Sequence, residues 1–386
     1  MLTGSGIEEI SRLSGPVLTA YLNTQPAERA RHMPVPASIT WLKEAAKSLE
    51  PSLAAAEQVL SREQLNRIEE FLRDRHPHEK SVAVFAGRNA WQFVPLQVAV
   101  NNDLRWGAPA VSQLLWLVDE HRPHCIVVVD RTGARFLRYQ LRELLELEEK
   151  KFTIDISQWK MKDLGHVTGQ RVHKTRGSQR DAFDHRVEAQ YERLCRQAAQ
   201  QAGAIYARER LQAIFLVGKD HLIELIEKDF PKELRHRVTL IKEDLGRSSV
   251  HELQNRLEPE IEKWEGQHEK ALVDSLLISK RGTVIEAEEA LAKLQQGKVR
   301  LLVLARDFNP NLRQCMVCGW TDRSADPACP KCGASRRLAA LQDVLPGLAR
   351  KYNVDLEVVS GSADKRLREA GGMGGWLRTT KQITQK

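Results

Sequence analysis

The sequence predicts an α/β protein with three α/β domains in tandem, the third an α/β/α sandwich with an inserted four-cysteine zinc ribbon. Short buried strands alternate with amphipathic helices along the chain. The 386 residues are more than one hydrophobic core usually organises, and two close cysteine pairs interrupt the last alternating segment. The predicted domains are an N-terminal domain, a middle domain with a basic loop, and the sandwich with its insertion: 1–123, 124–262 with loop 162–180, and 263–386 with insertion 311–337.

Composition and charge narrow the class of protein. The chain is 42% hydrophobic and 28% charged, which is typical of a soluble globular protein. No apolar run is long enough to cross a bilayer, and the opening MLTGSGIEEISRLSG has acidic residues where a signal peptide needs a basic region. We therefore expect a cytoplasmic protein. The net charge of +8 predicts a polyanionic partner, of which RNA or DNA is the usual one.

The N-terminal segment has the pattern of a small α/β unit. VLTAYLNT, residues 17–24, reads as a buried strand. Apolar periodicity predicts helices over 38–49 and 61–73. Residues 80–87 and 91–100 read as two strands, and the Gly-Arg-Asn stretch between them favours a hairpin turn.

The middle segment combines buried strands with one long helix. Residues 125–139 read as two strands joined at an Arg-Thr-Gly turn. A basic stretch over 159–179 precedes a long helix, whose apolar face repeats at three- and four-residue steps in Phe183, Val187, Tyr191, Leu194 and Ala198. A buried strand, a helix and a short strand are expected after it, over 211–219, 220–230 and 239–246.

In the C-terminal segment, helices are expected over 271–282 and 286–298, followed by a buried strand over 299–307. After the cysteine-containing insertion come a helix over 341–354 and a strand over 355–361. Without the insertion this remainder predicts a compact sandwich.

The strongest chemical signal is Cys315-x-x-Cys318, ten intervening residues, then Cys329-x-x-Cys332. Each pair is followed by a glycine that permits a tight turn, so the two pairs can present four thiolates to one tetrahedral ion. Four sulfur ligands leave no open position, which predicts a structural Zn²⁺. An iron–sulfur cluster, a redox pair or unligated thiols are the alternatives. The basic residues around the pairs either contact RNA or a partner, or form a solvated surface.

A second signal lies in VHKTRGSQRDAFDHR, where a basic loop closes on Gly177-Ser178-Gln179. Ser178 is a good helix N-cap, with Asp181 three residues later. Gln179 would then lie in the first turn, where free backbone N–H groups can bind an anion or a developing oxyanion. The same residues also suit an ordinary helix start.

A basic loop that ends in Gly-x-Gln and leads into a long helix resembles the middle domain of archaeal and eukaryotic class-one release factors and Pelota. EAGGMGGWLR, residues 369–378, resembles the glycine-rich strand that closes the third domain of that family, and 17–24 resembles bacterial members. In that family the tip reads Gly-Gly-Gln, enters the peptidyl transferase centre and promotes hydrolysis of peptidyl-tRNA. The resemblance implies an α/β/α third domain, in which archaeal members often carry a cysteine-pair zinc insertion.

Two departures shape the functional expectation. Residue 178 is Ser where the family has a second Gly, and the first domain has no Asn-Ile-Lys-Ser-like stop-codon reader. Relatives without these motifs include Pelota, which rescues stalled ribosomes, and the hibernation factor Balon, which this chain resembles in domain order. The resemblance therefore implies a monomeric ribosome-binding factor that acts in the A site in hibernation or rescue, without reading stop codons.

The resemblance also suggests partners. Contacts to ribosomal RNA are expected from the basic loop, and a translational GTPase such as elongation factor Tu is a candidate partner. No membrane partner is expected. The expected RNA-binding residues are Arg171, His173, Lys174, Arg176 and Arg180.

Two alternatives stay open. The first is a codon-independent peptidyl-tRNA hydrolase, with Gln179 as the candidate catalytic residue beside Gly177 and Ser178. The second is an RNA-binding protein unrelated to the ribosome.

Overall fold

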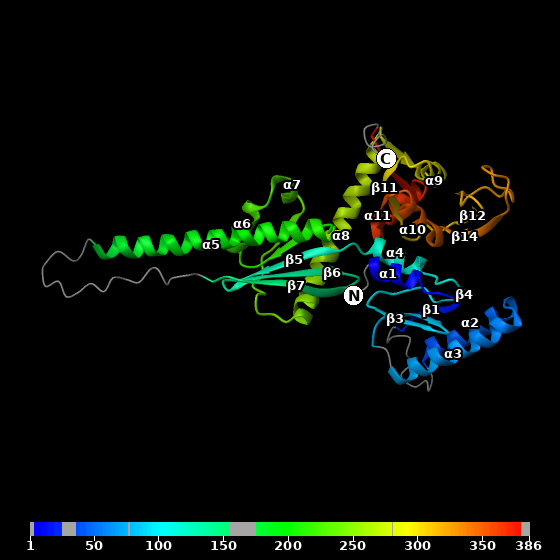
Figure 1. Ribbon diagram of the computed structural model, residues 1–386. Helices are drawn as coiled ribbons and strands as arrows, with labels where there is room; N and C mark the ends of the chain where they lie inside the picture. Colours follow the sequence, from blue (N-terminus) through cyan, green and yellow to red (C-terminus); the bar gives the residue numbers. More distant parts are fainter. Residues whose placement is uncertain (1–3, 25–35, 76–77, 154–174, 280, 380–386) are drawn as a thin grey trace. The chain divides into compact units, whose positions relative to one another are not determined.

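The computed structural model describes residues 4–24, 36–75, 78–153, 175–279 and 281–379. They form two compact units (Figure 1). Unit 1 combines the two ends of the chain, Met1–His121 and Pro259–Lys386, and unit 2 is Arg122–Glu258. The predicted division of the chain into three domains stays a prediction.

The N-terminal part of unit 1 is an antiparallel sheet covered by helices. Its sheet has the order β3-β2-β1-β4. Alternate side chains of β1 and β2, such as Leu18 and Val84, are buried against Leu42 of α2 and Ile68 of α3. Its elements are α1 (Gly4–Ser11), β1 (Val17–Asn23), α2 (Ala37–Leu49), the short helix η2 (Glu50–Ser52), α3 (Ala55–Arg75), β2 (Ser81–Gly87), β3 (Ala90–Leu96), β4 (Asp103–Gly107) and α4 (Ser112–Glu120).

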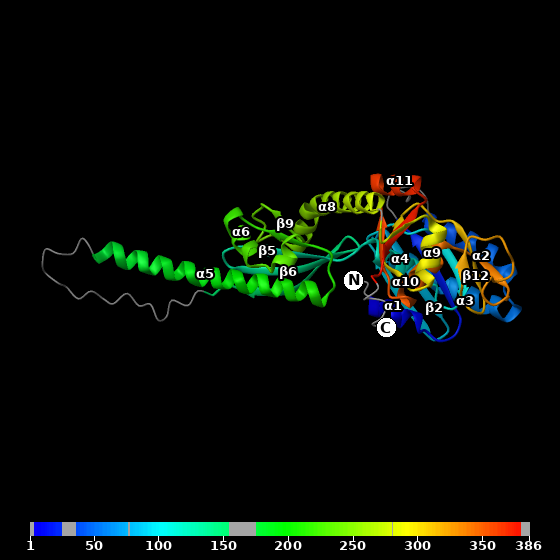
Figure 2. The same cartoon turned by 90° about the horizontal axis from the view of Figure 1, so that it is seen from above.

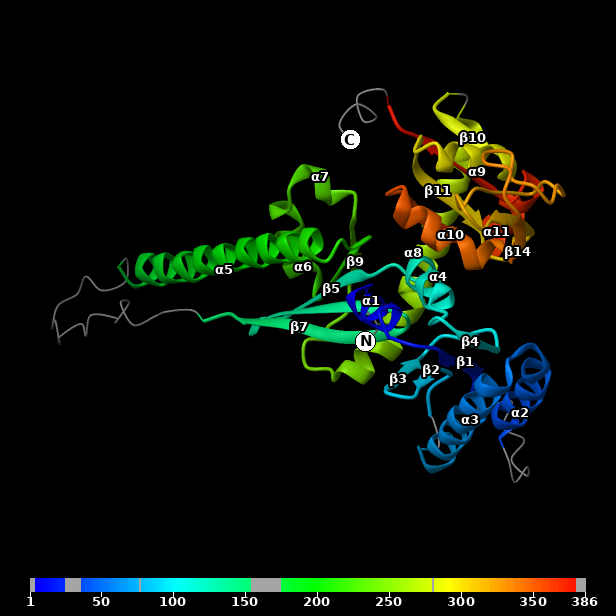
Figure 3. The same cartoon turned by 45° about the vertical axis from the view of Figure 1, so that its right-hand side comes forward.

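The C-terminal part of unit 1 is an α/β/α sandwich, as predicted (Figure 3). Its sheet has the order β10-β16-β11-β15. Helices α9 and α10 pack on one face, and α11 with the end of α8 packs on the other. The elements are α8 (Val250–Ile278), which begins in unit 2, then β10 (Thr283–Ile285), α9 (Ala287–Gln295), β11 (Val299–Ala305), α10 (Leu341–Lys351), β15 (Asp355–Val359), α11 (Gly361–Glu369) and β16 (Met373–Leu377).

The glycine-rich stretch noted in the sequence forms β16, which lies between β10 and β11. A Cβ at Gly375 would lie 2.5 Å from the carbonyl oxygen of Leu301, and one at Gly374 would lie 2.8 Å from that of Val284. Since both approaches are too short for a carbon atom, these positions need glycine. The motif is therefore explained by close backbone packing at the centre of the sheet.

Unit 2 is a five-stranded mixed sheet of order β7-β6-β5-β8-β9, in which β5, β8 and β9 are parallel. The C-terminal half of α5 and helix α6 cover one face, where Cys125 and Cys195 are buried among apolar side chains. The elements are β5 (His124–Val129), β6 (Gly133–Gln140), β7 (Glu143–Lys151), α5 (Thr175–Arg208), β8 (Ile214–Val217), α6 (Asp220–Asp229), α7 (Lys232–Arg235) and β9 (Val238–Ile241).

The start of α5 differs from the sequence expectation. The helix begins at Thr175, so Ser178 is its fourth residue and not its N-cap. Gln179 is the fifth residue, and only the first four N–H groups of a helix lack a partner within the helix. The prediction that the backbone N–H of Gln179 is free is therefore wrong. Once a helix is anchored, adding another turn costs little, so α5 extends through Gly177 although glycine is a poor helix former.

No helix in the described ranges is both long enough and apolar enough to cross a membrane.

Candidate functional site

The four cysteines of the insertion come together in the structure. Their Sγ atoms all lie within 4.8 Å of one another. The Cys315–Cys332 and Cys318–Cys329 pairs are each 3.5 Å apart, Sγ to Sγ. Four sulfurs at about 2.3 Å from one Zn²⁺ would be about 3.8 Å apart, so this geometry could hold one tetrahedral metal ion.

The local sequence explains why the thiols converge. Gly319 and Gly333 both adopt φ +73°, which a residue with a side chain rarely adopts. Each glycine N–H closes a tight turn on the carbonyl of the first cysteine of its pair, at 3.2 Å for Cys315 and 2.8 Å for Cys329. The turn directs backbone N–H groups at the sulfur, and those of Cys318 and Val317 both lie 3.4 Å from Cys315 Sγ. These hydrogen bonds lower the pKa of Cys315 to about 6, which favours the thiolate that a metal needs.

The cysteine turns rest on a small sheet of order β13-β12-β14. The side chain of Arg336 is fully buried in it, and its guanidinium binds Asp322 and donates to the carbonyl of Arg313 at 2.9 Å. These contacts stabilise the sheet beside the thiols. The three strands are β12 (Asn311–Cys315), β13 (Thr321–Asp322) and β14 (Arg336–Ala340). We call residues 311–340 the cysteine module.

Two buried side chains anchor the module to the sandwich: Leu312 of β12, which belongs to the apolar cluster of the sandwich, and Gln295 of α9. Gln295 of α9 accepts a hydrogen bond from the N–H of Thr321 at 2.8 Å and donates one to its carbonyl at 2.7 Å. This amide–backbone pair fixes the position of β13 against α9. The basic residue Lys331 lies over the Trp320 ring at 4.7 Å, which orders the second cysteine turn.

Of the other predicted site residues, Arg171, His173 and Lys174 lie outside the described residues. The first turns of α5 contain the backbone of the other five: Arg176, Gly177, Ser178, Gln179 and Arg180. The arrangement of their side chains lies outside the described part of the chain. Their roles stay predictions.

Helix α5 places this backbone far from the core of unit 2. Among its described side chains, the fully buried ones begin at Cys195. Tyr191 is half-buried, and its hydroxyl donates to the carbonyl of Asp130 at 3.2 Å. From Thr175 to Tyr191 the helix rises about 24 Å. Figure 2 shows this first part of α5 extending past the sheet. The helix can therefore carry its N-terminal end into a site that the sheet does not reach.

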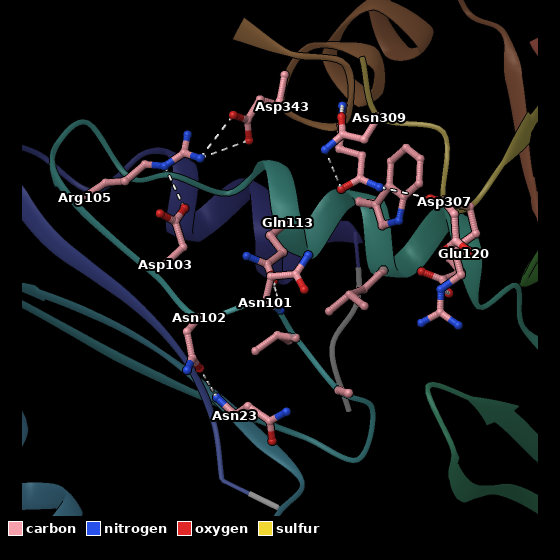
Figure 4. Close-up of a pocket in the computed structure, with 17 residues that line it drawn as sticks. Asn23, Asn101, Asn102, Asp103, Arg105, Gln113, Glu120, Asp307, Asn309 and Asp343 are labelled. Atoms are coloured by element: carbon pink, nitrogen blue, oxygen red, sulfur yellow. Dashed lines mark hydrogen bonds and ion pairs between the residues drawn. The ribbon is translucent and has the colours of Figure 1, made fainter. Parts of the chain in front are cut away.

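Unit 1 also contains a polar pocket of about 490 Å³, which the sequence analysis missed (Figure 4). Arg105 of β4 pairs with Asp103 at 2.7 Å and with Asp343 of α10 at 3.1 Å. Arg306 pairs with Glu120 of α4 at 2.8 Å. These pairs join α4 and β4 to the C-terminal sandwich. No motif signals the pocket, because its lining comes from five separated stretches of chain.

One protein-family model matches the chain, over residues 109–256, and this match supports the predicted resemblance to archaeal and eukaryotic class-one release factors and Pelota. The model is that of the bacterial archaeo-eukaryotic release factor family 10. Residues 109–256 match it, which covers nearly all of unit 2. The predicted likeness to Balon stays a prediction. No curated protein matches the chain.

The chain is also similar to solved structures. A model of ribosome-bound archaeal Pelota with ABCE1 is 11% identical, with a TM-score of 0.39, covering 98% of this chain and 95% of that one. Dom34 from S. cerevisiae is 8% identical, with a TM-score of 0.38 and coverage of 78% and 86%. The C-terminal domain of a peptide chain release factor from Methanosarcina mazei is 27% identical, with a TM-score of 0.26 and coverage of 34% and 95%.

Proposed function

We propose that the chain is a ribosome-binding translation factor that occupies the A site in hibernation or rescue and does not read stop codons. The match of residues 109–256 to a release-factor family carries this proposal. The net charge of +8 supports an RNA partner. Ser178 in place of a second glycine, and a Gln179 N–H engaged within α5, favour binding over hydrolysis.

The long helix supports a probe-like role for the middle segment. In this proposal α5 carries the basic residues to ribosomal RNA, where they contact phosphates and add little sequence selectivity. Delivery by a translational GTPase such as elongation factor Tu, action as a monomer and a cytoplasmic location belong to the same proposal.

For the cysteine module we propose a structural Zn²⁺ held by Cys315, Cys318, Cys329 and Cys332. The sulfur separations and the directed N–H groups support this metal. Four thiolates fill its coordination sphere, so the ion would stabilise the module and take no part in a reaction.

Ribosome binding can be tested by cosedimentation over a salt series. The change of Arg171, Lys174, Arg176 and Arg180 together to alanine should weaken binding and make its salt slope shallower by about 3, because each phosphate contact releases a counterion. A matched control removes the same charge from exposed basic residues elsewhere: Lys47, Arg88, Lys228 and Lys232. Equal binding by the two quadruple variants would contradict the assignment of the loop to RNA.

A further inference from the structure

The carboxyl ends of the three parallel strands of unit 2 surround a pocket of about 260 Å³. Residues 130–132 reach it directly after β5, and Lys219 reaches it two residues after β8. Asp244 and Arg247 reach it from the loop after β9. Three loops far apart in sequence therefore line one small space.

The topology of the sheet explains why a pocket forms here. From β5 the chain turns into β6 on one side, whereas from β8 it runs through α6 and α7 to β9 on the other side. The neighbouring parallel strands β5 and β8 thus send their connections in opposite directions. At such a switch point the loops separate, and α/β proteins bind ligands in the crevice outside the strand ends.

Two glycines let the loops pack closely against the end of β5. A Cβ at Gly218 would lie 2.7 Å from the carbonyl oxygen of Val129, and one at Gly246 would lie 2.4 Å from Asp130 Oδ2. Any larger residue would push the loop away. The walls of the pocket are therefore held by close backbone packing on a buried strand.

The charges around the pocket leave two cations for a ligand. Asp130 Oδ1 already accepts hydrogen bonds from the N–H and hydroxyl of Thr132, both at 2.6 Å, and Asp244 pairs with Lys219 at 2.9 Å. Arg131 and Arg247 are exposed, and neither makes a hydrogen bond or an ion pair with another residue in the described part of the chain. Three cations (Arg131, Lys219 and Arg247) and two acids (Asp130 and Asp244) line the pocket, so its formal charge is positive by one.

We propose that this pocket binds a phosphate group, held by Arg131 and Arg247. A planar guanidinium can bind two phosphate oxygens at once, which gives it both strength and orientation. The phosphate can belong to a free anion or nucleotide, or to an RNA backbone. This site lies beside the middle of α5, where Tyr191 donates to the carbonyl of Asp130, and not at the Gly-Ser-Gln stretch near the start of that helix. The proposed phosphate binding is separate from ribosome binding through the basic loop.

The proposal can be tested by two-dimensional NMR on the full-length protein at constant ionic strength. The probes are inorganic pyrophosphate, a nucleoside triphosphate and a short 5′-phosphorylated RNA. At least one probe should shift the amide signals of residues 131–133 and 218–219 in a saturable way. A response to the small probes alone identifies a free anion or nucleotide, and a response to RNA alone identifies a backbone phosphate. The absence of a saturable shift with all three probes would overturn the proposal.

Variants distinguish a specific phosphate-binding site from non-specific attraction to surface charge. Arg131→Ala with Arg247→Ala should weaken binding by at least about tenfold, since it removes two charge-assisted contacts. Arg131→Lys with Arg247→Lys keeps the charge and should still weaken binding, because lysine cannot form the two-pronged contact. The control, Lys228→Ala with Lys232→Ala, removes equal charge from the last turn of α6 and the start of α7, and it should have no effect. Equal losses in the two alanine pairs, or full binding by the lysine pair, would contradict the proposal.

Discussion

At the scale of single residues, Glu269 of α8 is a carboxyl group in an unfavourable place for a charge. Its Oε2 accepts hydrogen bonds from the N–H and hydroxyl of Ser360 at 2.7 and 3.1 Å. Burial, assisted by the nearby carboxylates of Glu265 and Glu357, raises the pKa of Glu269 to about 7. The folded chain therefore holds a proton on this side chain that the unfolded chain releases near pH 4.5.

This shift predicts a pH-dependent stability. The contribution of Glu269 is fully present below its unfolded pKa and is lost as the pH rises through about 7, by up to about 3 kcal/mol. Glu269→Gln removes the titrating group and keeps an oxygen that can accept from Ser360. The unfolding free energy of this variant should therefore fall less between pH 5 and 8 than that of the wild type. Urea unfolding at several pH values measures the difference. Glu260→Gln, an exposed position on the same helix, is the control. Parallel pH curves for the wild type and Glu269→Gln would contradict the argument.

At the scale of elements, the cysteine module has a small core and depends on its thiols. Arg336 joins the strands of the module to one another, and Gln295 joins the module to α9. Few apolar side chains are buried among its strands. A metal that holds four sulfurs would supply much of its folding free energy.

Metal removal should therefore unfold the module and spare the sandwich. We expect about one Zn²⁺ per chain by elemental analysis and its loss in Cys329→Ser. Hydrogen exchange should then become faster in β12, β13 and β14, and stay slow in β11 and β16. Cys195→Ala changes a thiol in the core of unit 2 and should keep the metal. A metal-free protein with slow exchange in β12 would contradict the metal assignment.

The elements also show what could be predicted from the sequence. The apolar run CIVVV was correctly predicted as a strand and forms most of β5, because a strand buried on both faces reads as an uninterrupted apolar run. Strand β7 was missed because ELLELEEKK is a charged edge strand, and because its turn uses Leu141 and Arg142 at positive φ in place of the usual Asn-Gly.

The candidate sites also differ in how far the sequence predicts them. The thiols of the cysteine module were predictable because their spacing alone specifies the chemistry. The pocket at the ends of β5, β8 and β9 was not, because Arg131 and Arg247 are 116 positions apart in the numbering and only the sheet topology brings their loops together.

At the scale of the whole molecule, the question is whether the factor only binds or also hydrolyses. Gln179 lies within α5, where its N–H is used by the helix. We therefore expect no peptide release above background from ribosomes loaded with peptidyl-tRNA, even when the factor saturates them. Release that disappears in Gln179→Pro would replace the binding proposal with the hydrolase. The measurement is the fraction of labelled peptide freed, with a codon-independent chemical release as the positive control.

The division of the chain into units has a consequence for synthesis. Trp116 of α4 belongs to the same apolar cluster as Leu345 of α10, although unit 2 lies between them in the sequence. The ribosome must make about 230 further residues before the partner of Trp116 exists, which at usual elongation rates takes roughly 10 to 45 seconds. During that time the apolar face of α4 on the nascent chain lacks the residues of α10 against which it packs in the folded protein. The order of translation thus delays the packing of α4 until the C-terminal sandwich has been made.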